Sequence, residues 1–192
     1  LRDALPAENE TGGNLYGLSA LDEHAALFKA LKASFEAQGL PYEGVLKEAA
    51  PAQYEINVAY CDNAVAYCDQ IISMQRCIRA VAQRFGALAS FMPKPFSDRA
   101  GNGAHYNMSL ADLESGENLF ESDSDPRGCG ITELGYWFIG GILKHLPALS
   151  AVISPTVNSY KRLIKEGSMS GFTWAPVFAC FGNNNRTNSI RV

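Results

Sequence analysis

Several features that define common protein classes are missing from this chain of 192 residues. Basic residues do not outnumber acidic ones, because 16 Lys and Arg stand against 20 Asp and Glu and give a formal net charge of -4. A protein that binds nucleic acid through its phosphates needs a basic face, so this charge balance predicts no nucleic-acid partner. No run of 18 apolar residues occurs, which predicts no membrane-spanning helix and no membrane partner.

Cysteine spacings suited to a zinc site or a disulfide framework are also lacking. The number of cysteines is odd and no CxxC pair occurs; they are Cys61, Cys68, Cys77, Cys129 and Cys180. Cys61 and Cys68 are seven residues apart, a spacing that would place both on one face of a helix. We therefore expect reduced, mostly buried thiols and a cytoplasmic location.

The ends of the chain show neither a starting methionine nor a charged-then-apolar signal segment, since the first residue is Leu1. Residues 189–192 at the other end have the composition of a strand. We therefore expect both ends to lie inside a longer gene product, and the length is that of about one domain.

What is present is an ordinary globular composition, with 47% hydrophobic and 19% charged residues. Apolar residues at helical spacing predict helices over residues 21–38, 62–85 and 132–146, and a helical turn over 149–153. Ser19 is expected to cap the first helix, and Pro147 is expected to end the third.

Extended patterns separate these helices. They predict strands within residues 44–60 and over 87–92, 105–110, 174–181 and 189–192. Residues 93–103 are rich in Pro and Gly and are expected to form a loop, whereas the acidic residues 112–130 are expected to form a surface excursion. This order predicts an α+β fold with an antiparallel sheet and helices on one of its faces.

A first candidate site is a group of carboxylates, Glu43, Glu48 and Glu55. Glu55 lies on the polar face of its predicted strand, and a strand pair joined near Pro51 would bring it close to Glu48. Convergent carboxylates repel each other unless a hard cation lies between them, and Mg²⁺ and Mn²⁺ prefer such oxygen ligands. The alternative is that these acidic side chains are simply solvated.

A second candidate site follows the Pro- and Gly-rich loop. Gly101 and Gly103 would let the backbone approach a ligand closely. His105, Asn107 and Ser109 would share one face of the predicted strand. A histidine with two polar neighbours suits a binding site, although a single histidine is more often structural or exposed.

A third candidate site is a set of arginines in the C-terminal part of the chain, Arg162, Arg186 and Arg191, accompanied by several amides. Arginine pairs bidentately with carboxylate and phosphate groups, so this set favours an anion site in an otherwise acidic protein. Scattered surface arginines are the alternative.

Taken together, these segments resemble the catalytic domain of the glutamine synthetase family, the ATP-dependent glutamate–amine ligases. The resemblance extends over nearly the whole chain. It is carried by four motifs in the family's order: Phe91-Met-Pro-Lys-Pro-Phe96, Gly101-Asn-Gly-Ala-His105, Gly140-Gly-Ile-Leu-Lys-His145 and Pro155-Thr-Val-Asn-Ser-Tyr-Lys-Arg162. Thr173-Trp-Ala-Pro176 and Gly182-Asn-Asn-Asn-Arg186 resemble the branch of γ-glutamylpolyamine and γ-glutamylmethylamide ligases.

The resemblance implies roles for the first two candidate sites. Glu48 and Glu55 correspond to carboxylates that hold one catalytic metal ion, Mg²⁺ or Mn²⁺. His105 corresponds to a ligand of a second metal ion on the nucleotide phosphates. Residues that contact ATP are also implied, and they are Glu43, Asn107 and Ser109.

The resemblance also implies roles for the glycine loop and the arginines. Gly101 belongs to the loop that binds glutamate, and Arg162 resembles the arginine that grips the α-carboxylate of that substrate. Arg186 and Arg191 resemble the pair that steadies phosphate during its transfer, with Arg191 also beside ATP. These three arginines are therefore the implied catalytic side chains.

The implied activity has two steps, in which ATP phosphorylates the γ-carboxylate of glutamate and ammonia or a small amine then displaces the phosphate. Catalysis of this kind is mostly positioning and electrostatics. The implied fold is a curved antiparallel sheet, a partial barrel, with helices on its outer face. Residues 1–192 would form a catalytic domain that is incomplete at both ends, from a homo-oligomeric ring.

Departures from the family pattern limit these expectations. Ala100 and Asn107 stand where the family usually has Asn and His, and Trp174 precedes Ala-Pro where the family has Glu. We therefore expect ammonia not to be the favoured amine. Further metal ligands of the family fall outside the chain, so this segment alone is expected to be inactive.

Two other functions remain open at this point. One is a non-catalytic homologue with a structural or binding role, against which the charged residues at Glu48, Glu55, His105 and Arg162 argue. The other is a related guanidino phosphotransferase, which the motif from Asn158 to Arg162 makes less favoured because it resembles an amino-acid site.

Overall fold

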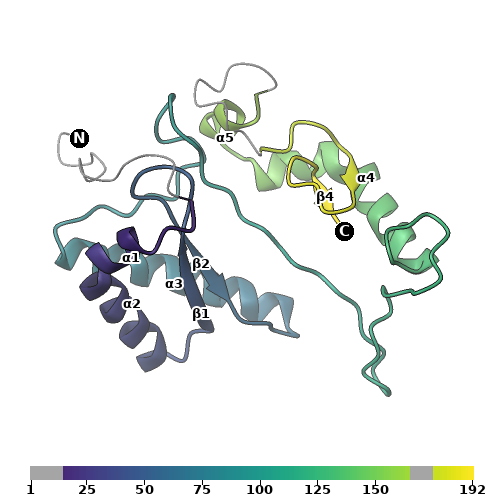
Figure 1. Ribbon diagram of the computed structural model, residues 1–192, viewed down its shortest axis with the longest axis horizontal. Helices are drawn as coiled ribbons and strands as arrows, with labels where there is room; N and C mark the ends of the chain where they lie inside the picture. Colours follow the sequence, from purple (N-terminus) through teal and green to yellow (C-terminus); the bar gives the residue numbers. More distant parts are fainter. Residues whose placement is uncertain (1–14, 165–174) are drawn as a thin grey trace. The chain divides into compact units, whose positions relative to one another are not determined.

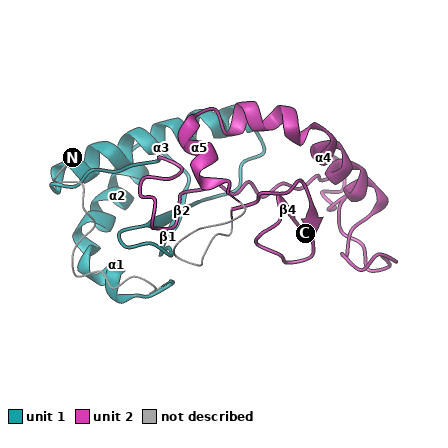
Figure 2. Cartoon of the chain, turned by 90° about the horizontal axis from the view of Figure 1, so that it is seen from above, with its two compact units in different colours: residues 1–91 teal, residues 92–192 magenta. Residues whose placement is uncertain are grey.

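The computed structural model describes residues 15–164 and 175–192 of the chain. The chain divides into two compact units, Leu1–Phe91 and Met92–Val192, which we call unit 1 and unit 2 (Figure 2). Each unit is described by itself below.

The described residues of unit 1 form three helices and one pair of strands, which Figure 1 labels. In chain order these are α1 (Ser19–Glu23), α2 (Ala25–Ala37), β1 (Tyr42–Lys47), β2 (Tyr54–Val58) and α3 (Ala64–Arg84). The helix predicted over 21–38 is therefore two helices, because the backbone leaves helical geometry at His24 (φ -107°, ψ 20°). The predicted cap at Ser19 is wrong, since Leu18 holds the N-cap position and no side chain caps the helix.

Helix α3 confirms the helix predicted over 62–85 and begins at a side-chain cap. The Oδ1 atom of Asn63 accepts hydrogen bonds from the backbone N–H groups of Val65 and Ala66, at 3.1 and 3.0 Å. Two N–H groups that have no partner within the helix are satisfied in this way. Gly86 follows the helix with φ +70°, a left-handed conformation that glycine adopts without strain.

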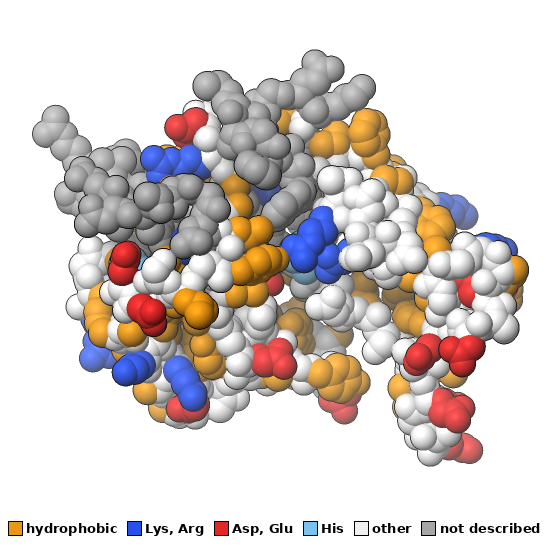
Figure 3. Space-filling model, viewed as in Figure 1, with side chains coloured by type: hydrophobic (Ala, Val, Ile, Leu, Met, Phe, Trp, Pro, Cys, Tyr) orange, Lys and Arg blue, Asp and Glu red, His pale blue; other side chains and the backbone are white. Residues whose placement is uncertain are grey.

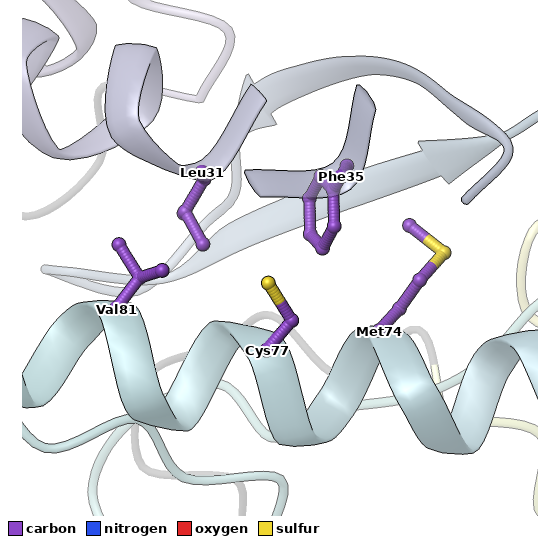
Figure 4. Packing of buried hydrophobic residues seen from close by; sticks show 5 residues of the cluster. All are labelled: Leu31, Phe35, Met74, Cys77 and Val81. Atoms are coloured by element: carbon purple, nitrogen blue, oxygen red, sulfur yellow. The ribbon is translucent and has the colours of Figure 1, made fainter. Parts of the chain in front are cut away.

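The core of unit 1 lies between α2 and α3 (Figure 4). Its fully buried side chains are Leu31 and Phe35 from α2 and Met74, Cys77 and Val81 from α3. Within each helix they are spaced three or four residues apart, as the apolar periodicity predicts. Tyr42, Ile56 and Val58 of the strand pair also pack against this cluster. One face of the strand pair is therefore held against the two helices.

Strands β1 and β2 are antiparallel, with Val45 opposite Ile56 and Lys47 opposite Tyr54. The turn between them is closed by a hydrogen bond from the N–H of Gln53 to the carbonyl oxygen of Ala50, at 3.1 Å. Pro51 lies inside that turn. The predicted strand pair joined near Pro51 is thus confirmed.

Unit 2 contains α4 (Glu133–Ile153), α5 (Val157–Arg162), β3 (Phe181–Gly182) and β4 (Ile190–Arg191). Strands β3 and β4 form a short parallel pair. The strands predicted over 87–92 and 105–110 are wrong, because neither range is assigned to a strand. Alternation specifies a pleated face, but a strand also needs a continuous ladder of backbone hydrogen bonds to a neighbour, and no such ladder is assigned to the described residues in these two ranges.

The prediction that Pro147 ends a helix is also wrong, because α4 continues to Ile153. Proline removes one N–H donor from a helix, so a carbonyl in the preceding turn needs another partner. Nearby, the hydroxyl of Ser150 donates to the carbonyl oxygen of Leu146 at 2.9 Å. At its start, α4 is capped by Thr132, whose Oγ1 accepts from the N–H of Gly135 at 3.2 Å.

Within the described part of the chain, α4 is the one helix long and apolar enough to cross a membrane, with a mean hydropathy of 1.3 over 18 residues. Core helices of water-soluble proteins meet the same criterion. Lys144 lies near the midpoint of α4, and a lysine at the centre of a bilayer costs about 3 kcal/mol. The position of this lysine therefore argues against a membrane-spanning helix, and α4 is largely exposed among the described residues.

The fold class is α+β as predicted, with a small antiparallel sheet covered by helices on one face. The described residues form two two-stranded sheets and no curved partial barrel. The acidic residues 112–125 form the expected surface excursion, whose acidic side chains gather at the lower right of Figure 3.

The cysteines are less buried than the sequence predicted. All five are free, but only Cys77 is buried. Cys61 precedes α3 while Cys68 lies within it, so their spacing of seven does not place both on one helical face.

Candidate functional site

Glu48 and Glu55 lie on the same face of the β1–β2 pair, opposite the face that packs against the helices. Glu55 pairs with Leu46 in the strand register. The N–H of Glu48 extends the pairing by donating to the carbonyl oxygen of Gln53, at 2.8 Å. Since side chains alternate along a strand, Glu48 shares the face of Leu46 and is the diagonal neighbour of Glu55, at about 7–8 Å.

A buried lysine supports this hairpin from its other face. Lys47 is 2% exposed, and its ammonium donates to the carbonyl oxygens of Glu48 and Ala50 at 2.7 and 2.6 Å. The same ammonium lies 5.8 Å from the centre of the Tyr54 ring. The carboxylate of Glu48 in turn accepts from the N–H of Ala49 at 2.9 Å. Hydrogen bonds from the Lys47 ammonium and from the N–H of Ala49 therefore hold the turn that carries Glu48.

The chemistry of this donor set suits a hard divalent cation. Glu48 and Glu55 offer carboxylate oxygens, the ligand type that Mg²⁺ and Mn²⁺ prefer. No group of three His, Cys, Asp or Glu residues that could hold a metal ion occurs among residues 15–164 and 175–192. The two glutamates therefore fit as part of a metal site that needs further ligands.

The remaining predicted metal and nucleotide residues are exposed. Glu43 lies on β1, next to the irregularity in register between Tyr42 and Gly44. His105, Asn107 and Ser109 belong to unit 2, in a segment without regular secondary structure, so the strand face expected to align them is not formed.

In unit 2, Arg162 of α5 packs against the backbone of the predicted glycine loop. A Cβ atom placed on Gly101 would collide with the carbonyl oxygen of Pro93 and lie 3.1 Å from Cδ of Arg162. A Cβ atom on Gly103 would lie 2.7 Å from Nη2 of Arg162. The loop therefore needs glycine at both positions, because the arginine occupies the space of a side chain.

The charge of Arg162 is partly withdrawn from water. Burial lowers the pKa of its guanidinium below the ordinary value. None of the described carboxylates forms an ion pair with Arg162; the ion pairs found join Lys32 to Glu36 and Arg127 to Glu133. A half-buried cation packed against a backbone that carries no side chain at Gly101 and Gly103 favours an anionic ligand such as a carboxylate.

The other two predicted arginines lie in, or directly after, the short loop that joins β3 to β4. Gly182 of β3 pairs with Arg191 of β4, and Arg186 lies in the loop between these strands. The side-chain oxygen of Asn185 accepts from the N–H and the hydroxyl of Thr187 in that loop, at 3.0 and 2.8 Å. The structure thus brings Arg186 and Arg191 to one loop, with both side chains exposed. Trp174 lies outside the described residues.

Three polar residues near these sites were not singled out by the sequence reasoning: Lys47, Lys94 and Asn158. Both lysines are buried, at 2% and 6% exposure. Lysine is almost always exposed, so composition and periodicity give no signal for its burial. Lys94 lies inside the motif Phe91–Phe96 and Asn158 inside the motif Pro155–Arg162. Their position in these motifs was the sequence signal that could have identified them.

Comparison with known proteins gives one consistent family. Residues 3–192 match the family described as "Glutamine synthetase, catalytic domain". A glutamate–methylamine ligase of Methyloversatilis universalis is 41% identical over 176 residues, which are 92% of this chain and 39% of that protein. A glutamine synthetase of Halobacterium salinarum is 38% identical over 180 residues, which are 94% of this chain and 37% of that protein.

A solved structure shows the same likeness in three dimensions. The structure titled "GmaS/ADP complex-Conformation 1" superimposes with a TM-score of 0.82 at 34% sequence identity, over 96% of this chain and 42% of that chain. The present chain thus spans 37–39% of the length of these two curated relatives.

Proposed function

The chain belongs to the glutamine synthetase family, and on this premise we propose that it forms part of the catalytic domain of an ATP-dependent ligase that joins glutamate to ammonia or a small amine. The observation that carries the proposal is the half-buried Arg162 packed against Gly101 and Gly103. This arrangement offers a guanidinium, beside a loop that glycine keeps free of side chains, to the α-carboxylate of glutamate.

The carboxylates of the hairpin and the histidine of unit 2 are each assigned as metal ligands. We assign Glu48 and Glu55 to one Mg²⁺ or Mn²⁺ ion and His105 to a second. When bound, such ions neutralise charge on the transferring phosphoryl group. The hydrogen bonds around Lys47 hold the backbone of Glu48 in place beforehand, which lowers the cost of ordering this ligand.

The residues assigned to the ATP site are Glu43, Asn107, Ser109 and Arg191. Arg186 and Arg191, on one loop, are suited to stabilise negative charge on the phosphoryl group as it moves. Arg162 holds the amino-acid end of glutamate and thereby directs the γ-carboxylate toward ATP.

The proposed reaction has two balanced steps. A γ-carboxylate oxygen of glutamate forms a bond to the γ-phosphorus of ATP, the bond to the β–γ bridging oxygen breaks, and ADP leaves. The amine nitrogen then bonds to the carbonyl carbon of the γ-glutamyl phosphate, the carbon–oxygen bond breaks, and inorganic phosphate leaves. The amine loses a proton to a base, and the product is a γ-glutamyl amide.

We propose a small alkylamine rather than ammonia as the favoured substrate. Support comes from the relative named glutamate–methylamine ligase, at 41% identity, and from the replacement of the family's Glu by Trp174 before Ala-Pro. Glutamine synthetases are similar at nearly the same identity, so the amine must be settled by experiment.

We also propose that the site, the curved sheet and a homo-oligomeric ring need more polypeptide than these 192 residues. The relatives are more than twice as long as the part matched here. The exposed α4 and the exposed, irregular segment 105–110 are elements that the rest of a catalytic domain would cover. We expect such a protein to act in the cytoplasm, and the five free thiols fit that location.

The test is phosphate release by the full-length protein containing these residues, with ATP, glutamate and Mg²⁺ or Mn²⁺, and with methylamine or ammonia as the amine. We expect glutamate-dependent release with a larger kcat/KM for methylamine. A larger kcat/KM for ammonia would overturn the choice of amine. No release with any amine would instead support a non-catalytic homologue, and transfer to a guanidino compound would support a phosphotransferase.

A further inference from the structure

Helix α5 carries a second polar residue on the same side as Arg162. Asn158 lies four residues before Arg162, which places both on one face of the helix. Its Oδ1 atom accepts from the N–H of Lys94 at 2.8 Å, and its Nδ2 atom donates to the carbonyl oxygen of the same residue at 2.8 Å. One side-chain amide thus satisfies both backbone groups of a residue 64 positions away in the sequence.

Lys94 opens the glycine loop, which is tied together internally. Its buried ammonium donates to the carbonyl oxygen of Arg99. At the far end of the loop, the backbone N–H of Asn102 donates to the carbonyl oxygen of Pro93, and its side chain donates to that of Met92, both at 2.8 Å. These hydrogen bonds connect the far end of the loop to its beginning, where Asn158 holds Lys94.

The two ends of this loop meet the same helix. Its beginning is fixed to α5 by the two hydrogen bonds of Asn158, and its end contacts the side chain of Arg162 through Gly101 and Gly103. If Lys94 shifted by a few tenths of an ångström, the backbone of Gly101 and Gly103 would therefore shift relative to the guanidinium of Arg162.

We propose that Asn158 is a positioning residue of the carboxylate site: it holds the loop of residues 93–103 on α5 so that Gly103 and Arg162 keep the spacing that an amino-acid α-carboxylate requires. The inference rests on the proposed function for the identity of the ligand, glutamate. Asparagine suits the role because its amide has a donor and an acceptor on one planar group. Aspartate has no donor for the carbonyl oxygen of Lys94, and alanine has neither group.

The first experiment measures steady-state kinetics of Asn158→Asp and Asn158→Ala in the full-length protein. We expect KM for glutamate to rise about tenfold or more, the effect of losing one to two buried hydrogen bonds, with KM for ATP unchanged. A role limited to folding would reduce the active fraction, and hence the apparent kcat, and would leave KM for glutamate unchanged. That result would overturn the proposal.

The matched control is Asn118→Ala in the same unit. The side-chain oxygen of Asn118 also accepts a backbone hydrogen bond, from Phe120 at 3.0 Å, but the residue lies in the acidic excursion. We expect its KM for glutamate to equal that of the unchanged protein. A rise equal to that of the Asn158 variants would show that loss of any such hydrogen bond suffices, and would contradict the specific role of Asn158.

A second variant pair tests whether Asn158 acts through Arg162. In the background of Arg162→Lys, which lacks the planar guanidinium, the further change Asn158→Asp is expected to raise KM for glutamate less than twofold. A full tenfold rise in that background would show that Asn158 acts independently of Arg162. Should Asn158→Asp not fold, Asn158→Ser, which keeps one donor, replaces it in both experiments.

Calorimetric titration with L-glutamate separates this inference from the proposed function. If the unchanged protein binds glutamate without ligase turnover, and Asn158→Asp binds it about tenfold more weakly, the inference stands while the proposed function fails. If the unchanged protein turns over and both proteins bind glutamate equally, the inference alone fails. If the unchanged protein binds no glutamate, both are wrong.

Discussion

Arg162 lies so close to Gly103 that a Cβ atom on residue 103 would be only 2.7 Å from its Nη2 atom. The contact joins a motif centred on residue 160 to one centred on residue 100, and it defines the surface of the proposed carboxylate site. Most of the expectations that can be tested by substitution start from this contact or from the hairpin of unit 1.

The first prediction concerns Gly103→Ala. The added methyl group would push the guanidinium away from the loop, so we expect KM for glutamate to rise about tenfold with kcat changed less. Gly140→Ala is the control, since a Cβ atom at that helical position meets nothing within 4 Å. Equal KM values for glutamate in the two variants would contradict the assigned site.

The second prediction concerns the hairpin carboxylates. Glu48→Gln and Glu55→Gln each remove a negative charge from one face of the β1–β2 pair, and we expect about a tenfold or larger loss of affinity for Mn²⁺. Paramagnetic resonance of free Mn²⁺ measures this binding without turnover. Glu114→Gln, in the exposed acidic excursion, should bind Mn²⁺ as the unchanged protein does.

The third prediction concerns the stability of unit 1. Lys47→Met keeps the apolar stem but removes the buried ammonium that donates to the carbonyl oxygens of Glu48 and Ala50, so we expect a loss of about 2 kcal/mol in the free energy of unfolding. Urea denaturation measures it. Lys32→Met removes an exposed ion pair to Glu36 at 3.8 Å and should cost less than about 0.5 kcal/mol. A similar cost for both would show that Lys47 is not a structural tie.

The fourth prediction concerns pH. Partial burial alone would raise the pKa of the Asp125 carboxyl, but hydrogen bonds from the Tyr136 hydroxyl and the N–H groups of Arg127 and Cys129 outweigh it and lower the pKa to about 2. A carboxyl with a depressed folded-state pKa stabilises the protein above the unfolded-state pKa, about 3.9, and this contribution is lost as pH falls toward 2.

Unfolding measured between pH 5 and pH 2 tests this expectation. Asp125→Asn should be less stable than the unchanged protein at pH 5, and the difference should shrink toward pH 2. Asp123→Asn is the control, because its exposed carboxylate accepts no hydrogen bond from the described residues. A difference for Asp125→Asn that stays constant over this range would show that its charged form is not the stabilised one.

Local patterns in the sequence predicted part of this fold well. The apolar spacing over 62–85 predicted α3 (Ala64–Arg84), and alternation near Pro51 predicted the hairpin and its polar face. These features succeed because periodicity decides which face of a helix or strand is apolar, and that is a property of the segment itself. The motifs likewise predicted the family, which the comparison confirmed.

Local patterns failed where the outcome depends on a distant partner. Residues 105–110 alternate as a strand does, yet they are not assigned to a strand. Pro147 lies inside α4, which continues to Ile153, because a proline removes one N–H donor from a helix and the rest of the helix can still form. The roles assigned to Glu48 and Glu55 stay predictions that Mn²⁺ binding to the variants tests, and the roles assigned to His105, Arg186 and Arg191 also stay predictions.

The sequence by itself determined the family, the main helices, and the polar face that carries Glu48 and Glu55. Only the tertiary structure decided that Lys47 and Lys94 are buried, and that Asn158 and Arg162 hold opposite ends of one glycine loop. The physical reason is that a buried ammonium or a side-chain amide is stabilised by carbonyl and N–H groups brought to it by folding. The loop that Asn158 holds is 64 residues away along the chain, far beyond the range of any local period.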